Sequence, residues 1–218
     1  KIVKVFPVIK AKFTSDNVGC SPLPISFINQ STTGSSSFWN FGNGFISASA
    51  NPSHTFINNG TVDSIYSVTL IATNSSGCQD TAVRLITVHP NPAVSFDVDK
   101  VSGCQPFEVI ITNTTTGATS YLWDFGDGNT STTTNALFTH TYSHNSTSPI
   151  TYTIRLTATS PFGCIKTTTK TVTVFPKISA AFTSNTMGCS PLRVKFTNQS
   201  SGASTYFWDF GDGFVDAG

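Results

Sequence analysis

The sequence is poor in charged residues and has no long apolar run, and both shortages exclude classes of protein. Charged residues make up only 11% of the 218 residues, against about 25% in an average soluble domain. The 12 Lys and Arg nearly balance the 11 Asp and Glu, so we expect no basic stripe and no nucleic-acid partner. No stretch reaches the roughly 20 apolar residues that a membrane span needs, so we expect no span in this segment.

The sequence also lacks a signal peptide at its start and ends abruptly. We therefore expect it to be a piece of a longer protein. It contains five cysteines whose neighbours are similar, which favours an oxidising compartment outside the cytosol.

What the sequence does contain is one motif written three times. Each copy reads Trp-Asx-Phe-Gly-Asx-Gly, and the tryptophans recur at intervals of 84 and 85 residues. The motif positions are Trp39, Asn40 and Asn43, then Trp123, Asp124 and Asp127, then Trp208, Asp209 and Asp212. A Gly-Cys pair precedes each motif at Cys20, Cys104 and Cys189, and a second pair follows the first two motifs at Cys78 and Cys164.

The repeat also sets the expected domain boundaries, because a proline closes each unit at Pro7, Pro90 and Pro176. Residues 1–7 match the last strand of a preceding unit. Residues 8–90 and 91–176 form complete units, and residues 177–218 form the N-terminal half of a further one. Since proline restricts its own backbone and that of the residue before it, we expect stiff linkers and units arranged end to end.

Each unit is predicted to be all-β. Apolar residues alternate with polar ones at Ile25 and Phe27, and again along Tyr66, Val68, Leu70 and Ala72. This period of two indicates strands with one buried face. About seven short strands in roughly 85 residues are typical of a two-sheet, immunoglobulin-like sandwich, with the Trp filling its core.

The hexapeptide Trp123–Gly128, followed by His140-Thr141-Tyr142 and the strand Tyr152–Leu156, resembles the PKD domain, an immunoglobulin-like module. The Gly-Cys landmarks resemble those in PKD repeats of large bacterial surface proteins exported by the type IX system, including gliding-motility adhesins. The first unit departs from the motif, with Asn40 and Asn43 in place of Asp. The resemblance implies a secreted cell-surface protein whose partners are neighbouring PKD domains of the same long chain, with surface polysaccharide or other surface proteins as further candidates.

The Asx residues of the motif are interpreted as turn residues. An Asx oxygen accepts hydrogen bonds from backbone N–H groups two residues on. Asn40 and Asn43 keep that acceptor, whereas a calcium site would favour carboxylates, so calcium is the minor alternative and no cofactor is expected. Nearly every polar residue has a counterpart in the next repeat or sits in a turn, which predicts no enzyme and no catalytic residue. Asp63-Ser64-Ile65 and Asp80-Thr81-Ala82 resemble a short bacterial O-glycosylation signal, so Ser64 and Thr81 are candidate modification sites.

The cysteines allow two pairings. The simple one lies within units, Cys20 with Cys78 and Cys104 with Cys164. However, these residues are expected in the first and last turns of a sandwich, at opposite ends and about 20 Å apart, whereas a disulfide needs Cα atoms within about 7 Å. We therefore prefer an interdomain bond between Cys20 and Cys164. Cys78 and Cys104 would then pair with units outside this sequence, and Cys189 with a later unit.

Together these patterns predict a structural or adhesive repeat segment of a long cell-surface filament or stalk. Two alternatives stay open. One is a set of accessory modules in a secreted polysaccharide- or protein-degrading enzyme. The other is a carbohydrate-binding array, which would need exposed aromatic platforms, whereas the three tryptophans are expected inside.

Overall fold

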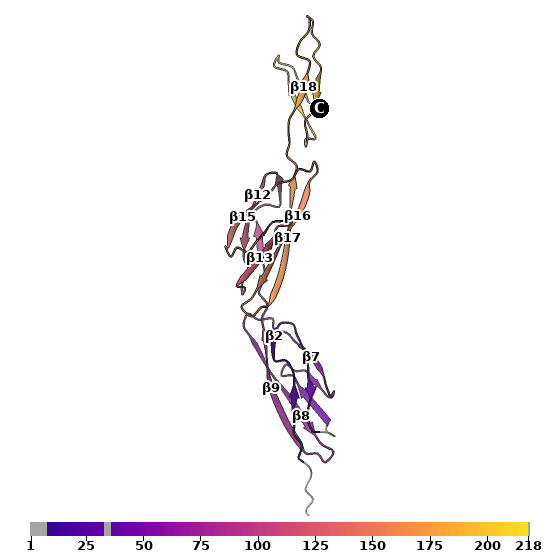
Figure 1. Cartoon of the computed structure of the whole chain (residues 1–218), viewed down its shortest axis with the longest axis vertical. Coiled ribbons are helices and arrows are strands. Elements are labelled where there is room, and N and C mark those ends of the chain that lie inside the picture. Colours follow the sequence, from indigo (N-terminus) through magenta and orange to yellow (C-terminus); the bar gives the residue numbers. More distant parts are fainter. Residues whose placement is uncertain (1–7, 33–35, 218) are drawn as a thin grey trace, which may run out of the picture. The chain divides into compact units, whose positions relative to one another are not determined.

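The chain folds as β-sandwich repeats (Figure 1). The computed structural model describes residues 8–32 and 36–217, and the regular structure in that part of the chain consists of strands alone. The strand expected over residues 1–7 lies outside the described residues. Within the described ranges no helix is long and apolar enough to cross a membrane.

The first repeat is a two-layer sandwich. Its strands are β1 (Phe13–Thr14), β2 (Val18–Cys20), β3 (Leu23–Ser26), β4 (Ile28–Asn29), β5 (Ser36–Asn40), β6 (Ile46–Ser47), β7 (Ser53–Phe56), β8 (Ser64–Thr73) and β9 (Gln79–His89). One layer is the five-stranded sheet β2-β9-β8-β5-β6, and the other contains the pairs β3-β7 and β1-β4. All neighbours in the first sheet are antiparallel except β2 and β9, which run parallel.

Side chains from both layers meet in one apolar core. Val68, Leu70 and Ala72 of β8 are fully buried, as the alternation of that strand predicts. Trp39 of β5 is also fully buried, and its indole N–H donates to Ser49 O at 2.9 Å. Phe13 meets Trp39 edge to face at 5.1 Å between ring centroids, a geometry that adds about 0.5–1.5 kcal/mol beyond area burial.

The second repeat has the same construction. Its strands are β10 (Phe96–Val98), β11 (Ser102–Cys104), β12 (Phe107–Asn113), β13 (Ser120–Asp124), β14 (Thr130–Ser131), β15 (Leu137–Tyr142), β16 (Ile150–Thr159) and β17 (Ile165–Phe175). The five-stranded sheet is β11-β17-β16-β13-β14, and the second sheet is β10-β12-β15. Trp123 is fully buried like Trp39, although its indole N–H has no partner among the described residues.

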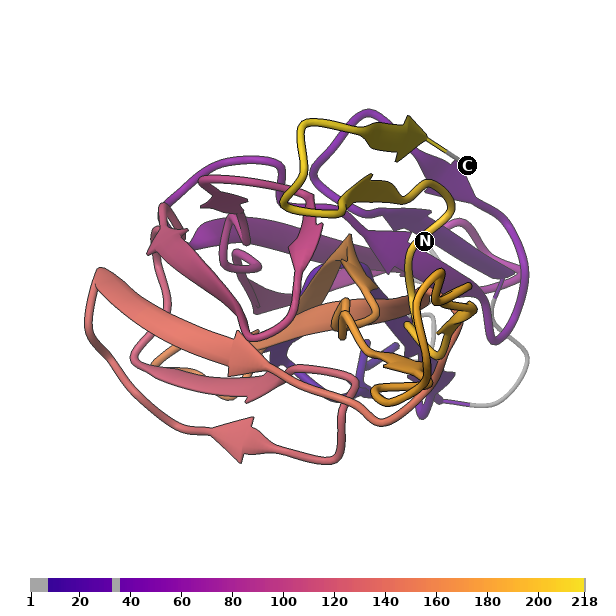
Figure 2. The ribbon, with the colours of Figure 1, turned by 90° about the horizontal axis from the view of Figure 1, so that it is seen from above.

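Residues 177–217 form four short strands: β18 (Phe182–Ser184), β19 (Phe196–Asn198), β20 (Phe207–Asp209) and β21 (Val215–Ala217). They pair two by two, β18 with β19 and β20 with β21, and the second pair lies side by side in yellow in Figure 2. Trp208 is only half-buried and Phe182 is 58% exposed. Counterparts of β16 and β17, which close the core in the complete repeats, are not part of this sequence.

The backbone contacts divide the chain into two compact units. The first contains the residues up to Val94 together with the segments Thr115–Tyr121 and Thr157–Lys166 of the second repeat. The second contains Ser95–Thr114, Leu122–Leu156 and the residues from Thr167 onward. The first repeat and these two segments therefore form one body, and the site described next lies wholly within it.

Candidate functional site: a covalent joint in the first compact unit

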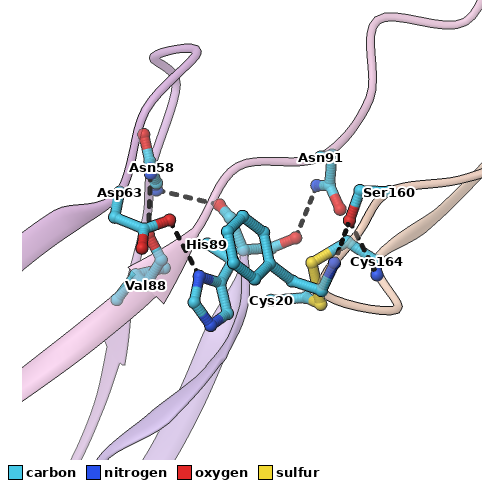
Figure 3. Close-up of a disulfide and its surroundings, with 10 residues drawn as sticks. Cys20, Asn58, Asp63, Val88, His89, Asn91, Ser160 and Cys164 are labelled. Carbon is cyan, nitrogen blue, oxygen red and sulfur yellow. Dashed lines mark hydrogen bonds and ion pairs between the residues drawn. A yellow bond between two sulfur atoms is a disulfide. The ribbon is translucent and has the colours of Figure 1, made fainter. Parts of the chain in front are cut away.

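A disulfide joins Cys20 of the first repeat to Cys164 of the second (Figure 3). The sulfurs are 2.03 Å apart and the Cα atoms 5.4 Å. This is the interdomain pairing preferred from the sequence, and the alternative pairs Cys20–Cys78 and Cys104–Cys164 are not formed. Cys164 is 1% exposed, so the bond is shielded from water on that side.

Cys20 ends a strand, whereas the sequence placed it in a turn. Residues 18–20 form β2, which pairs in parallel with the end of β9 and sets Cys20 beside His89. Ser21 N extends this pairing by donating to His89 O at 3.0 Å. The parallel pairing explains the difference, because it carries Cys20 to the end of the sandwich where β9 leaves it. We call Cys20, Ser21, Asn58, Val88 and His89 the docking face.

Hydrogen bonds of two buried polar residues hold the docking face in shape. Asn58 N donates to Ser21 Oγ at 2.8 Å, and Asn58 Nδ2 donates to Val88 O at 2.7 Å. Ser21 and Asn58 are 7% and 6% exposed, so these bonds are protected from competing water. Asn91, just beyond β9, donates from its side chain to Ser21 O. The first turn, the end of β9 and the linker are thus tied together.

An aromatic stack that the sequence did not predict adds to the joint. The ring of Phe162 lies parallel to that of His89 with centroids 3.9 Å apart, and His89 Nδ1 is 2.8 Å from Asp63 Oδ1. From the sequence, His89 was expected in the linker beside Pro90, and Phe162 was not a candidate residue. One signal was available: Phe162 precedes the second Gly-Cys pair, where the first repeat has Ser76, so it is an aromatic residue without a counterpart.

The other half of the joint is the turn Ser160–Cys164, which we call the Gly-Cys turn. Ser160 N donates to Cys164 O at 2.8 Å, and Cys164 N donates to Ser160 Oγ at 3.1 Å. Gly163 has φ of 81°, a left-handed conformation that favours glycine. The turn therefore holds its own shape through local bonds and presents Cys164 and Phe162 to the docking face.

A cavity of about 740 Å³ lies beside the joint in the same unit. Its lining includes Asn59, Thr61, Asn91, Thr116 and Phe162, with Lys166 as its one charged residue. Such a lining can hydrogen-bond a neutral polar partner. It has no carboxylate or imidazole to act as general acid or base.

Each Asx residue of the repeated motif accepts a hydrogen bond within its own repeat. Asn40, Asp124 and Asp209 each accept a hydrogen bond from the glycine two residues on, at 2.9 Å in all three repeats. Asn43, Asp127 and Asp212 likewise accept from the backbone N–H two residues on, at 3.4, 3.0 and 3.0 Å. Asn and Asp thus make the same turn, with or without a charge.

A histidine ties the second Asx residue to the sandwich. His140 Nε2 is 2.8 Å from Asp127 Oδ2, and its ring stacks on Phe125 at 3.9 Å. His54, Asn43 and Phe41 repeat the arrangement in the first repeat. Burial raises the pKa of the Asp127 carboxyl, but hydrogen bonds from His140 and Asn129 outweigh it and hold the pKa below its usual value. Burial also lowers the pKa of His54.

The remaining candidate residues are not gathered at one place. Cys78, Cys104 and Cys189 carry free thiols, with Cys104 and Cys189 exposed. Thr81 is exposed on β9 and Ser64 is half-buried at the start of β8. Within residues 8–32 and 36–217, no group of three His, Cys, Asp or Glu side chains lies close enough to hold a metal ion.

The fold and the Cys20–Cys164 bond together define a class of protein. Its members consist of immunoglobulin-like β-sandwich modules that follow one another along the chain, and here a disulfide joins two of them. The sequence matches the family described as PKD domain over residues 4–88 and 87–175. The chain therefore belongs to the PKD domain family. Such modules are usually non-catalytic and serve structural or adhesive roles in extracellular or secreted proteins.

Among solved structures, the chain is similar to the PKD1 domain of the Vibrio cholerae metalloprotease PrtV. The identity is 32% and the TM-score 0.31, over 38% of this chain and 96% of that one. The PKD1 domain of Vibrio anguillarum Epp is 28% identical, with a TM-score of 0.31, over 38% and 93% of the two chains. The fibronectin(III)-like modules of Clostridium thermocellum CbhA are 13% identical, with a TM-score of 0.34, over 78% and 94%. Comparison with curated protein sequences finds no match.

Proposed function

We propose that this chain is a load-bearing spacer segment of an extracellular, cell-surface filament or stalk. The observation that carries the proposal is the Cys20–Cys164 bond, which links residues 144 positions apart. A module that only adds bulk to a secreted protein has no need of such a bond. A spacer under tension does, because the bond keeps the intervening chain from being drawn out.

The bond changes the route that tension takes through the chain. A pull on the two ends passes along the residues before Cys20, crosses the two sulfurs, and continues after Cys164. Strands β3 to β16 lie in the closed loop, outside the covalent path of the tension. Fully extended, a loop of this size would add on the order of 500 Å at about 3.5 Å per residue.

Single-molecule stretching by the chain ends tests this route. We expect the oxidised chain to unfold without releasing the loop, and the double variant C20S/C164S to lengthen by a further 400–500 Å, in line with the roughly 3.5 Å that each extended residue spans. C189S is the matched control, because it removes an exposed free thiol and leaves the loop closed. Equal lengthening of both chains would show that the joint bears no load. An accessory role in a secreted hydrolase would then be the better interpretation.

The wider setting of the proposal rests on sequence. The Gly-Cys landmarks resemble those of type IX-exported gliding-motility adhesins, and we propose a gliding or adhesive surface protein of that kind as the parent. We also propose that the segment has no catalytic activity of its own, with neighbouring PKD domains as its first partners and Ser64 and Thr81 as glycan carriers. The carbohydrate-binding alternative is not favoured, because Trp39 and Trp123 are fully buried and offer no platform.

A further inference from the structure

The second compact unit contains a second docking face, around Cys104, which forms no disulfide. Cys104 ends β11, which pairs in parallel with the end of β17 and sets Cys104 beside Phe175, as Cys20 is set beside His89. Gln105 N donates to Phe175 O at 3.2 Å, the counterpart of the bond from Ser21 N to His89 O. The backbone that positions the cysteine is therefore the same on both faces.

The supporting side chains are also matched, although their identities differ. His144 N donates to Gln105 Oε1 at 2.6 Å, and His144 Nε2 lies 3.1 Å from Val174 O. These two bonds reproduce those of Asn58 with Ser21 Oγ and with Val88 O. The same supporting hydrogen bonds are therefore made on both faces by different residues.

This second face is open. Cys104 is exposed and carries a free thiol. Beside it lies a cavity of about 480 Å³ lined by residues that include Gln105, His144, Asn145 and Pro176. In the first compact unit Ser160 and Phe162 of the bound Gly-Cys turn line the corresponding cavity, whereas no Gly-Cys turn borders this one among the described residues.

The same chain also contains a second Gly-Cys turn, Asn74–Cys78, whose cysteine forms no disulfide. Asn74 N donates to Cys78 O at 3.0 Å, and Cys78 N donates to Asn74 Oδ1 at 3.0 Å. Gly77 has φ of 84°. These features repeat those of Ser160–Cys164, with Asn74 in the place of Ser160. Cys78 is half-buried and its thiol is free.

We propose that the face around Cys104 is a second covalent docking site, and that its occupant is the Gly-Cys turn of another PKD repeat of this type. A second copy of this chain presents such a turn at Asn74–Cys78. Because face and turn are different surfaces, each added copy leaves one of each free, so the contact is head to tail and extends without closing. The inference rests on the proposed spacer function, to which it adds the joining of further repeats.

The bond forms by thiol–disulfide exchange with a low-molecular-weight disulfide such as glutathione disulfide. The thiolate of Cys78 attacks one sulfur of that disulfide and releases one glutathione thiolate. The thiolate of Cys104 then attacks the mixed disulfide at Cys78 Sγ and releases the second. The two protein thiols lose two protons and two electrons, and the glutathione disulfide is reduced to two thiols.

The test is to incubate the full chain in a glutathione redox buffer, separate the products without reduction, and map the linked peptides. We expect a ladder of dimers and longer forms joined by Cys78–Cys104. This linkage should exceed Cys104–Cys104 by about tenfold, equivalent to about 1.4 kcal/mol of preferential docking. C78S and C104S should each abolish the ladder, and C189S should leave it unchanged.

A mixture of C78S and C104S tests the head-to-tail contact directly. C78S keeps the face and C104S keeps the turn, so an equal mixture should yield a dimer and no trimer, which also shows that both variants are folded. S76F places an aromatic residue where the bound turn has Phe162, against the 40% exposed Phe175, and should speed linkage. Linkages spread evenly over Cys78, Cys104 and Cys189, or glutathione adducts alone at Cys104, would overturn the proposal. Stretching of single chains does not involve these thiols, so failure here and failure of the spacer function are distinguishable.

Discussion

At the scale of single residues, every repeat keeps the hydrogen-bond acceptors of the Gly-x-Gly turn, whereas the first repeat lacks their charge. Asp127 accepts from His140, from Asn129 N and from Asn129 Nδ2. Asn43 makes the corresponding contacts to His54 and Phe45 N without a charge. The first repeat is therefore a natural comparison for substitutions in the second.

We expect Asp127→Ala to destabilise the chain by about 1–3 kcal/mol, because it leaves partly buried donors unpaired. Asp127→Asn should cost less than about 1 kcal/mol, because an amide oxygen keeps the turn as it does at Asn43. Urea unfolding at neutral pH measures both. An equal loss in the two variants would mean that the charge, and not the acceptor, holds the turn.

The remaining contribution of the charge should depend on pH. The pKa of Asp127 is lowered in the folded chain, so its ionised form stabilises the fold above the unfolded pKa of about 3.9. That contribution is lost as the pH falls through the folded pKa. The stability difference between the natural chain and Asp127→Asn should therefore shrink below about pH 4, in unfolding curves recorded between pH 7 and pH 2.

Two glycines of the same turn allow the cost of a left-handed backbone to be measured apart from the cost of a steric clash. Gly126 and Gly128 both have positive φ, 79° and 91°. A Cβ on Gly126 would lie 2.7 Å from Thr153 O and 2.9 Å from Thr153 N, whereas one on Gly128 would meet nothing within 4 Å.

We expect Gly128→Ala to cost about 1–2 kcal/mol for the left-handed conformation alone. Gly126→Ala should cost a further 1–3 kcal/mol or so, because the backbone of β16 would have to move. The two urea midpoints give the comparison directly. If the two variants are equally stable, β16 moves aside at little cost and the close approach is not required.

At the scale of elements, the short parallel strands β2 and β11 carry the cysteines that define the docking faces. Each adds three residues to the edge of a five-stranded sheet. Hydrogen bonds hold β2 parallel to the end of β9, and β11 parallel to the end of β17. Each short strand therefore runs in the direction in which the chain leaves its sandwich. A cysteine on such a strand is placed for a partner beyond its own repeat.

The disulfide itself should stabilise the folded chain. We expect C20S/C164S to lower the free energy of unfolding by about 4–5 kcal/mol, because the 144-residue loop is no longer closed in the unfolded chain. C189S should leave the urea midpoint unchanged, since that thiol is exposed and unbonded. A loss below about 1 kcal/mol in the double variant would indicate that the bond restrains the folded chain without stabilising it.

At the scale of the whole molecule, the three repeats are not equally complete. Phe182 and Phe196 are 58% and 39% exposed. Their counterparts in the second repeat, Phe96 and Ile111, are fully buried. Residues 177–217 thus have the early strands of a sandwich without a buried core.

We expect the amides of β18 to β21 to exchange with solvent far faster than those of β8, β9, β16 and β17, because few buried contacts oppose local opening. Hydrogen exchange read by mass spectrometry on the intact chain tests this. The matched controls are β10, β12, β13 and β14, the corresponding strands of the complete second repeat. Equal protection in the two sets would show that the partial repeat folds without its missing strands, and residues 177–218 expressed alone should then melt cooperatively.

Short stretches of sequence were enough to predict the long strands and the Gly-x-Gly turns of this protein. Alternation along β8 and β16, glycine at left-handed positions and Asx acceptors two residues before their donors are short-range effects, and each predicts its element from a few neighbouring residues. Because the motif recurs at intervals of 84 and 85 residues, each prediction made for one unit also applied to the next. The buried Trp39 and the turns at Asn40 and Asp124 are of this kind.

The positions of the residues in the docking faces, in contrast, could be seen only in the tertiary structure. The parallel pairing of β2 with β9 brings together residues about 70 positions apart, and no local pattern distinguishes that strand from the turn expected there. The stack of His89 on Phe162 likewise joins two repeats. For the cysteines, strand geometry favoured Cys20–Cys164 but left the intradomain pairs open. A disulfide depends on where two distant backbones place their sulfurs, and only the folded chain sets that distance.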